Sequence, residues 1–406
     1  MAKPSRLKNL QQLLRFRAPI WNPTERRLSK ALTIYDLRKI AKRRTPIGPF
    51  DYTDGAADQE ISLGRARRAF EDIEFQPLIL RDVSKADLSA DLFGKTMQLP
   101  LGIAPTGFTR MMNTDGEIAG AQTAAKYGAP FCLSTMGTTS IEAVAKAAPS
   151  GSNWFQLYLW RDRDRSLELI KRADEAGFDG LVLTVDAQVA GSRLRDVRNG
   201  LTIPPSLTVK TLLNAAPRTH WWWNFLTKDP LVFASLEAWD GTVAELMNTM
   251  FDPTMTFEDL KWIRKVWKRN LIVKGVQNVA DAKQVVKNGA DAVWLSNHGG
   301  RQLDRAPVPF HLIPETRKVL GKSIPIHFDT GIMHGADVIA GLAKGGSFAW
   351  IGRAYLYGLM AGGKAGVDRT FSILQSQMTR TMKLLGVNEI AELEPNMVKF
   401  ISETRI

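Results

Sequence analysis

Several features that would define other protein classes are scarce or absent in this sequence of 406 residues. A single cysteine, Cys132, excludes an internal disulfide and is typical of a protein in a reducing cytoplasm. No apolar run reaches the roughly 20 residues of a membrane-spanning helix, and the basic N-terminus lacks the apolar core of a signal peptide. The GxGxxG pattern of nicotinamide-binding Rossmann domains is missing, and the histidines lack metal-ligand spacing, so we predict neither NAD nor a metal.

Acidic residues are scarce at one end of the chain. Overall, 54 Lys and Arg face 41 Asp and Glu, a formal net charge of +13. Residues 1–44 hold thirteen of the basic residues and only two acidic ones, so this N-terminal arm carries most of the excess. A basic arm favours anionic lipid or nucleic acid as a partner. Because the arm has no known motif with interleaved stacking aromatics, we do not expect nucleic acid.

Short apolar segments and longer amphipathic ones alternate from residue 99 onward. The apolar segments are 99–105, 130–135, 153–160, 179–186, 270–276, 291–299, 324–331 and 347–353. Capping patterns at Thr139 with Glu142 and at Thr256 with Asp259 predict the starts of two intervening helices. Eight strand–helix units predict an α/β fold, a closed parallel (β/α)8 TIM barrel.

Three parts of the chain are expected to make up the protein. Residues 1–98 are predicted to form the basic arm, helices and a short hairpin packed beside the barrel. The barrel spans 99–385 and includes a long insertion, 194–255, after the fourth strand. Residues 386–406 are a C-terminal tail, and the length of the insertion favours a functional role.

Polar residues gather where the predicted strands end, which is where barrel enzymes place their active sites. They are Pro105, Thr106, Gly107, Ser134, Gln156, Tyr158, Thr184, Asp186, Lys274, Ser296, His298, Asp329, Gly352 and Arg353. His298 beside two glycines, with Asp186 to hold its ring, has the pattern of a general base. Arg193 and Arg301 form a candidate fork for a carboxylate. All eight strands contribute, so we predict an enzyme.

A phosphate site is predicted beyond the last two strands. DTGIMHG (329–335) enters a helix, and IGR (351–353) ends the eighth strand. Backbone N–H groups at helix N-termini in this part of a barrel often bind phosphate. The barrel is therefore expected to hold a phosphorylated ligand, with Lys274 and His298 above it.

These motifs together resemble the FMN-dependent L-2-hydroxy acid dehydrogenase and oxidase family. The matching motifs are IAPTG (103–107), LST (133–135), FQLY (155–158), LTVD (183–186), VKG (273–275), SNHGGRQLD (296–304), IGR (351–353) and, N-terminally, FDYTDGAADQE (50–60). RDVRNG (195–200), DRAPVPFHL (304–312) and GRAYLYGLMAGG (352–363) are most similar to the bacterial quinone-dependent L-lactate dehydrogenases in that family.

The resemblance implies a role for each residue. His298 would be the base and Asp186 would stabilise its imidazolium, while Tyr52, Tyr158, Arg193 and Arg301 would hold the substrate. Lys274 would stabilise negative charge at the N1/O2 edge of the flavin. The implied FMN contacts are Pro105, Thr106, Gly107, Ser134, Gln156, Thr184, Lys274, Ser296, Asp329, Gly331, Gly352 and Arg353. The resemblance also suggests a homotetramer.

Two departures from the family pattern affect these expectations. Met333 stands where the family usually has an arginine after the seventh strand, so phosphate binding would depend on Arg353, backbone amides and His334. TVDAQ (184–188) replaces the usual TVDTP, so that Ala187 and Gln188 follow Asp186, the expected partner of the base His298.

The resulting functional prediction is oxidation of L-lactate to pyruvate, with electrons passed from FMN to a membrane quinone. Within the family, an oxygen-using lactate oxidase or monooxygenase and a dehydrogenase for mandelate or glycolate remain alternatives. HWWWNFL (220–226) in the insertion has two interpretations, an interfacial membrane anchor or a plug in a subunit interface. With the basic arm, the anchor would place the protein peripherally on the inner face of the cell membrane.

Overall fold

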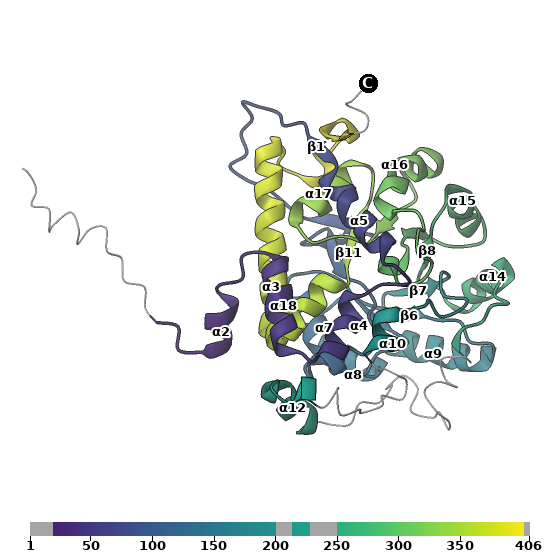
Figure 1. The fold of residues 1–406 in the computed structure, drawn as a ribbon. Coiled ribbons are helices and arrows are strands. Elements are labelled where there is room, and N and C mark those ends of the chain that lie inside the picture. The colour runs from purple at the N-terminus through teal and green to yellow at the C-terminus, as the bar shows by residue number, and fades with distance from the viewer. Residues whose placement is uncertain (1–18, 200–212, 228–249, 402–406) are drawn as a thin grey trace, which may run out of the picture.

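The computed structural model describes residues 19–199, 213–227 and 250–401. Within these ranges eight parallel strands close into a barrel (Figure 1). In the strand order, β4 lies next to β11 and β9 next to β10. The strands are β4 Leu101–Ile103, β5 Phe131–Ser134, β6 Asn153–Leu157, β7 Gly180–Thr184, β8 Asn270–Val276, β9 Ala292–Leu295, β10 Ile326–Phe328 and β11 Phe348–Ile351. Each lies within one of the eight predicted apolar segments, so the TIM-barrel prediction is confirmed. Nearly every strand residue is buried, as expected for parallel strands covered on both faces.

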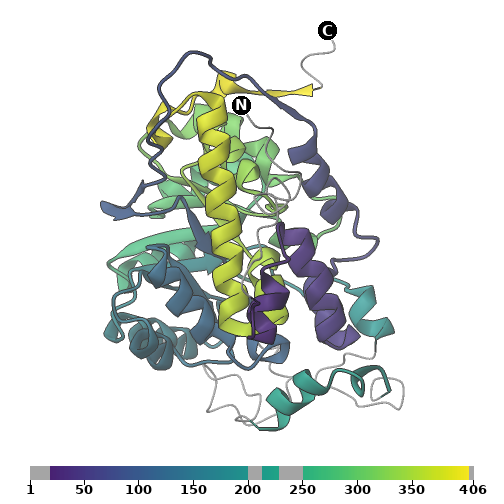
Figure 2. The same cartoon turned by 90° about the vertical axis from the view of Figure 1, so that its left-hand side faces the viewer.

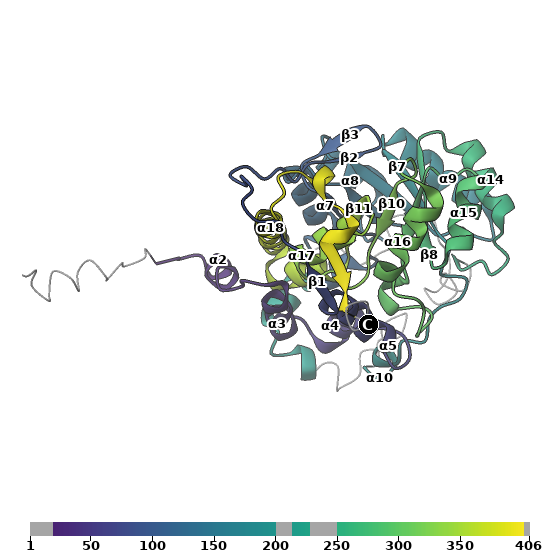
Figure 3. The same cartoon turned by 90° about the horizontal axis from the view of Figure 1, so that it is seen from above.

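Helices surround the barrel, as the view from above shows (Figure 3). They are α6 Thr109–Met112, α7 Gly116–Lys126, α8 Ile141–Ala147, α9 Arg163–Glu175, α14 Phe257–Val266, α15 Val279–Lys287, α16 Pro309–Leu320, α17 Gly335–Ala343 and α18 Arg353–Leu385. The capping box of Thr256 with Asp259 is confirmed at α14. The predicted cap of α8 is wrong by one residue, because Ser140 accepts the N–H of Ala143. The hydroxyl of Thr139 donates instead to the buried carboxylate of Glu117.

The N-terminal region packs against the barrel as helices and a hairpin, which agrees with the expectation for it. Its helices are α2 Pro23–Leu28, α3 Ile34–Arg44, α4 Ile47–Asp54 and α5 Ile61–Glu71, and its hairpin joins β2 Ala90–Leu92 to β3 Lys95–Met97. In Figure 2, α2 and α3 lie alongside the long α18. The C-terminal segment, with turns η3 Ile390–Glu392 and η4 Pro395–Met397, ends in β12 Val398–Phe400, which pairs antiparallel with β1 Ile73–Phe75. The division into three parts stays a prediction.

Aromatic side chains fill the interior of the barrel. Trp154, Trp294 and Trp350, from three different strands, are fully buried together with His327 and Phe348. Gly102 on β4 makes room for this layer, because a Cβ atom there would lie 2.7 Å from the Trp350 ring. The described interior of the barrel is therefore a packed core, and a ligand of the barrel would lie at the strand ends.

The described parts of the insertion form two short helices. These are α10 Leu194–Arg198 and α12 Thr219–Leu226. The indole N–H of Trp221 donates to the carbonyl of Met111 at 2.9 Å, which fixes α12 against the barrel side of the molecule. Trp223, two residues on, is 72% exposed. Among the described helices, none is long and apolar enough to cross a membrane.

Candidate active site

Two adjoining pockets lie at the carboxyl ends of the strands. The larger encloses about 350 Å³, and the predicted residues that line it are Tyr52, Pro105, Thr106, Gly107, Lys274, His298, Arg301, Asp329, Gly331, Gly352 and Arg353. The smaller encloses about 50 Å³, and the predicted residues that line it are Tyr158, Arg193, His298 and Arg301. His298 and Arg301 face both pockets. The structure thus brings most of the predicted site residues together.

The other predicted residues are buried behind the pocket walls. Ser134 and Gln156 lie opposite each other on β5 and β6, and the Ser134 hydroxyl donates to Gln156 Oε1 at 2.9 Å. Gln156 Nε2 and Thr184 Oγ1 are buried and have no hydrogen-bond partner among the described residues. Because buried polar atoms are rarely left unpaired, these two atoms indicate contact with a bound molecule.

His298 lies at the junction of the two pockets, between an acid and a phenol. Its Nδ1 is 2.9 Å from Asp186 Oδ1, and its Nε2 is 3.3 Å from the Tyr158 hydroxyl. The backbone of His298 has φ 58°, a left-handed conformation that is unfavourable for a residue with a side chain. A hydrogen bond from its N–H to the Ser296 hydroxyl, 3.1 Å long, supports this turn. Strain of this kind is common where a side chain must be aimed at a ligand.

The pKa values around His298 keep its imidazole neutral. Burial lowers the pKa of His298, and the charges of Lys274 and Arg301 lower it further, against the opposing effect of Asp186. Burial would raise the pKa of Asp186, but His298 and Lys274 outweigh it, so this carboxylate is ionised. Burial raises the pKa of Tyr158, which keeps its phenol protonated. A neutral imidazole oriented by a carboxylate can accept a proton.

Two guanidinium groups flank one tyrosine ring beside His298. The Cζ atoms of Arg193 and Arg301 lie 5.0 and 4.7 Å from the centre of the Tyr52 ring. Burial lowers the pKa of Arg301 to about 10, and neighbouring Arg193 contributes to the shift. Asp196 Oδ2 lies 3.4 Å from Arg193 Nε and offsets part of this positive charge, and a substrate carboxylate would add a second anion between the two guanidinium groups.

Lys274 brings a buried cation to the larger pocket. Its Nζ donates to Ser296 Oγ at 3.1 Å and lies 3.6 Å from Asp329 Oδ2. The next residue, Gly275, has φ 100°, and a Cβ atom there would lie 2.6 Å from the Asp186 carboxyl carbon. Only glycine allows strand β8 to present Lys274 while Asp186 packs against it, which explains the lysine–glycine pair in physical terms.

At the end of the larger pocket toward α17 and α18, the described cations already have protein partners, and Arg67 there pairs with Asp337. Met333 lines this end in place of the arginine of the family pattern. Arg353 lines it too, although its Nε and Nη2 donate to the carbonyls of Thr53 and Gly55 at 3.0 and 2.7 Å. His334 does not line the pocket, and its Nδ1 caps α17 by accepting the N–H of Ala336.

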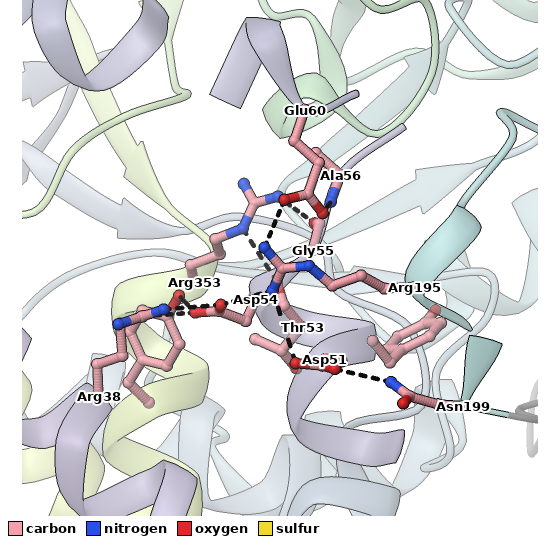
Figure 4. Close-up of polar contacts among 12 residues, drawn as sticks. Arg38, Asp51, Thr53, Asp54, Gly55, Ala56, Glu60, Arg195, Asn199 and Arg353 are labelled. Carbon is pink, nitrogen blue, oxygen red and sulfur yellow. Dashed lines mark hydrogen bonds and ion pairs between the residues drawn. The ribbon is translucent and has the colours of Figure 1, made fainter. Parts of the chain in front are cut away.

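Sequence reasoning missed an ion network that connects the insertion to α4 (Figure 4). Arg195 on α10 donates to Asp54 Oδ2 at 2.9 Å and also bonds Glu60. Asp54 further accepts a bond from Arg38 Nε at 2.5 Å, and these interactions lower its pKa to about 2 despite burial. The network holds α10 in place, and α10 directly follows Arg193. The two segments that the network joins, FDYTDGAADQE (50–60) and RDVRNG (195–200), were recognised in the sequence as separate motifs. Nothing in the sequence indicated that they pair.

The residues at this site fit FMN. Unpartnered Gln156 and Thr184 atoms can bond the polar edge of a flavin, and the larger pocket is of the right size class for a small cofactor. A comparison with protein families also indicates FMN, because residues 41–400 match the FMN-dependent dehydrogenase family. The chain therefore belongs to this family, whose members act on 2-hydroxy acids, and the predicted cofactor and enzyme class are confirmed.

Individual relatives agree with this assignment. A Mycobacterium tuberculosis protein named "Putative L-lactate dehydrogenase" is 56% identical over 393 residues, which cover 97% of this chain and 95% of the relative. The L-lactate dehydrogenase of Caulobacter vibrioides is 38% identical over 370 residues, which cover 89% of this chain and 96% of that relative. The crystal structure of the monotopic membrane protein (S)-mandelate dehydrogenase superposes with a TM-score of 0.88 at 34% identity, covering 91% of this chain and all of that one.

Proposed function

We propose that this enzyme oxidises L-lactate to pyruvate and passes the electrons from FMN to a membrane quinone. The observation that carries the proposal is the placement of neutral His298 between Asp186 and Tyr158, facing a small pocket flanked by two arginines. A proton acceptor beside a carboxylate site is what oxidation of a 2-hydroxy acid requires.

Each polar side chain has a role in this reaction. Arg193 and Arg301 bind the substrate carboxylate, and the phenols of Tyr52 and Tyr158 orient its hydroxyl. His298 takes up the proton that leaves the substrate, and ionised Asp186 stabilises the resulting imidazolium.

The cofactor supplies the redox chemistry. When bound, FMN would supply the acceptor for the two electrons and for the hydrogen that does not go to His298, and it would pass the electrons on to the final acceptor. Lys274 provides positive charge for the reduced cofactor. We assign the remaining cofactor contacts to Ser134, Gln156, Thr184 and Ser296 for the ring, to the backbone of 105–107, and to Asp329, Gly331, Gly352 and Arg353 for the ribityl phosphate.

The size of the smaller pocket supports lactate over substrates with larger side chains. Its volume of about 50 Å³ is bounded by Met136, Tyr158 and Phe251, among others. We expect these side chains to leave room for a methyl group beside the carboxylate, whereas a phenyl group would have to displace them.

Peripheral membrane attachment is part of the proposal, because a quinone is lipid-soluble. The similar (S)-mandelate dehydrogenase structure is described as that of a monotopic membrane protein. Exposed apolar side chains on and near α12, Leu213, Trp223 and Leu226, would enter the headgroup region, and the basic arm would be drawn to anionic lipid. Residues 1–18 of that arm lie outside the described residues.

The reaction is tested by adding L-lactate to the FMN-loaded enzyme without oxygen. We expect the flavin absorbance to bleach, and we expect His298→Gln to keep the oxidised spectrum while slowing bleaching about 10²–10⁴-fold or more. A quinone analogue should then reoxidise the flavin faster than oxygen does. Rapid reoxidation by oxygen alone would favour an oxidase, and no bleaching by any 2-hydroxy acid would refute the proposal.

Membrane attachment is tested by sedimentation with anionic vesicles at low and high salt. Deleting residues 1–30, or replacing Trp223 and Leu226 with serine, should each reduce the bound fraction. Leu384→Ser, an equally exposed leucine on the last turn of α18, is the matched control and should bind normally. If the intact enzyme stays in the supernatant at low salt, the exposed side chains of α12 belong to a subunit interface.

A further inference from the structure

The indole layer, which we define as Trp154, Trp294 and Trp350, lies directly beneath the larger pocket. Trp350 lines the pocket, and the Trp294 ring stacks on it with centroids 4.4 Å apart and planes inclined by 26°. The centroid of the Trp154 ring is 5.1 Å from that of Trp350. All three rings are fully buried, so their N–H groups need partners inside the protein.

The three indoles find different partners. Trp154 donates to Ser152 Oγ at 3.2 Å, and Trp350 donates to His327 Nδ1 at 3.0 Å. Only Trp294 reaches a charged group of the candidate active site: its N–H donates to Asp329 Oδ2 at 3.1 Å.

This carboxylate oxygen is the one that faces Lys274. Lys274 Nζ lies 3.6 Å from Asp329 Oδ2, and the same ammonium lies 5.7 Å from the centre of the Trp294 ring. The other carboxylate oxygen, Oδ1, accepts the Thr330 hydroxyl at 2.7 Å. Trp294 therefore contacts both members of a buried ion pair and competes with Lys274 for one oxygen.

We propose that Trp294 is a positioning residue that sets how much of the Lys274 charge is available to the cofactor. The inference rests on the role of Lys274 in the proposed function. By donating to Asp329 Oδ2, the indole N–H takes up part of the negative charge that would otherwise hold the ammonium. Without that bond the carboxylate attracts Lys274 more strongly, and less positive potential reaches the larger pocket. Such competition is strong in a buried, low-dielectric environment.

The test uses sulfite as a probe of positive charge at the flavin of the FMN-loaded enzyme, with its dissociation constant read from the loss of visible absorbance. Trp294→Phe keeps an aromatic ring but removes the N–H. We expect this variant to bind sulfite about tenfold more weakly, the effect of one hydrogen bond to a charged group, and to have a lower flavin reduction potential. Trp154→Phe removes an N–H from the same layer without touching Asp329, and should match the wild type.

A double-mutant cycle separates positioning from packing. In an Asp329→Asn background, Trp294→Phe should have no further effect on sulfite binding, because the charge through which it acts is gone. A purely structural role would give the same loss in both backgrounds. If Trp294→Phe does not fold, Trp294→Met, another apolar side chain without an N–H, takes its place in the cycle.

The outcomes distinguish this inference from the proposed function on which it rests. Lys274→Met should weaken sulfite binding at least as much as Trp294→Phe. An unchanged constant in Lys274→Met would refute the assigned role of Lys274. A loss in Lys274→Met with none in Trp294→Phe, or an equal loss in Trp154→Phe, would overturn the role of Trp294 alone.

Discussion

Replacing Phe251 with alanine should change which 2-hydroxy acids the enzyme accepts. Phe251 follows the last undescribed part of the insertion and lines the smaller pocket. Its ring meets the Tyr158 ring edge-on, with centroids 5.6 Å apart and planes inclined by 71°. It packs with Met136 in a small apolar cluster at the pocket wall. The side chain therefore limits the substrate without contributing a polar group to the chemistry.

The expected magnitude follows from the apolar wall that Phe251 and Met136 form. A phenyl group in place of a methyl group would press against these side chains, and forcing extra volume into a packed site costs about 1–3 kcal/mol. In wild-type enzyme, kcat/KM for L-lactate should then exceed that for (S)-mandelate by about 10–100-fold. Phe251→Ala removes most of one wall, so this ratio should fall about tenfold or more.

The assay is anaerobic stopped-flow reduction of the flavin with L-lactate, L-2-hydroxybutyrate and (S)-mandelate. Phe257→Ala, on α14 and outside both pockets, is the control for loss of a phenyl group. Selectivity that is unchanged in Phe251→Ala would show that the smaller pocket does not receive the substrate side chain. Equal rates for lactate and mandelate in the wild type would contradict the volume argument itself.

Three further predictions concern charge. Met333→Arg should lower the Kd for FMN about tenfold or more, because it adds a charged contact to the phosphate. Titration of the apoprotein with FMN measures this Kd. An unchanged value would mean that the backbone and Arg353 suffice to bind the phosphate. The unperturbed pKa of a histidine is 6.5, and that of His298 is lowered, so kcat/KM should fall on the acid side only below pH 6.5. Because Asp186 raises the pKa of His298, Asp186→Asn should shift this fall to a still lower pH. The pKa of Asp54 is about 2 when folded, against 3.8 unperturbed, so Asp54→Asn should lose about 2 kcal/mol of stability at neutral pH. That loss should shrink between about pH 4 and about pH 2 as the wild-type carboxylate is protonated, which chemical denaturation at each pH would show.

The barrel was predictable because parallel strands buried on both faces appear as uninterrupted apolar runs. The chemistry was predictable because polar residues at strand ends stand out against those runs. The cap of α8 was not, because the hydroxyl of Thr139 is used by Glu117, a residue from a different helix. Likewise Arg195 bonds Asp54 across 141 positions of sequence, and a pattern search has no means of pairing residues so far apart.

The three consecutive tryptophans show another limit of sequence reasoning. Considered as a set, they indicated one apolar patch. In α12, however, successive residues are rotated by about 100°, so they cannot share a face. Trp221 turns inward to donate to Met111, whereas Trp223 turns outward and is exposed. A surface for lipid or for a partner must therefore combine Trp223 with Leu226, three residues along, and not with its immediate neighbours.

The charges of the site also explain why the base needs an acid beside it. A carboxylate substrate and a reduced cofactor both call for cations, and Lys274, Arg193 and Arg301 supply them. Lys274 and Arg301 also lower the pKa of His298, as burial does, and each lowering makes the imidazole a weaker base. Asp186 opposes this effect from 2.9 Å away and remains ionised although its side chain is buried. The acid thus restores part of the basicity that the cations for the substrate and cofactor remove, so its loss should slow proton transfer even where the substrate still binds normally.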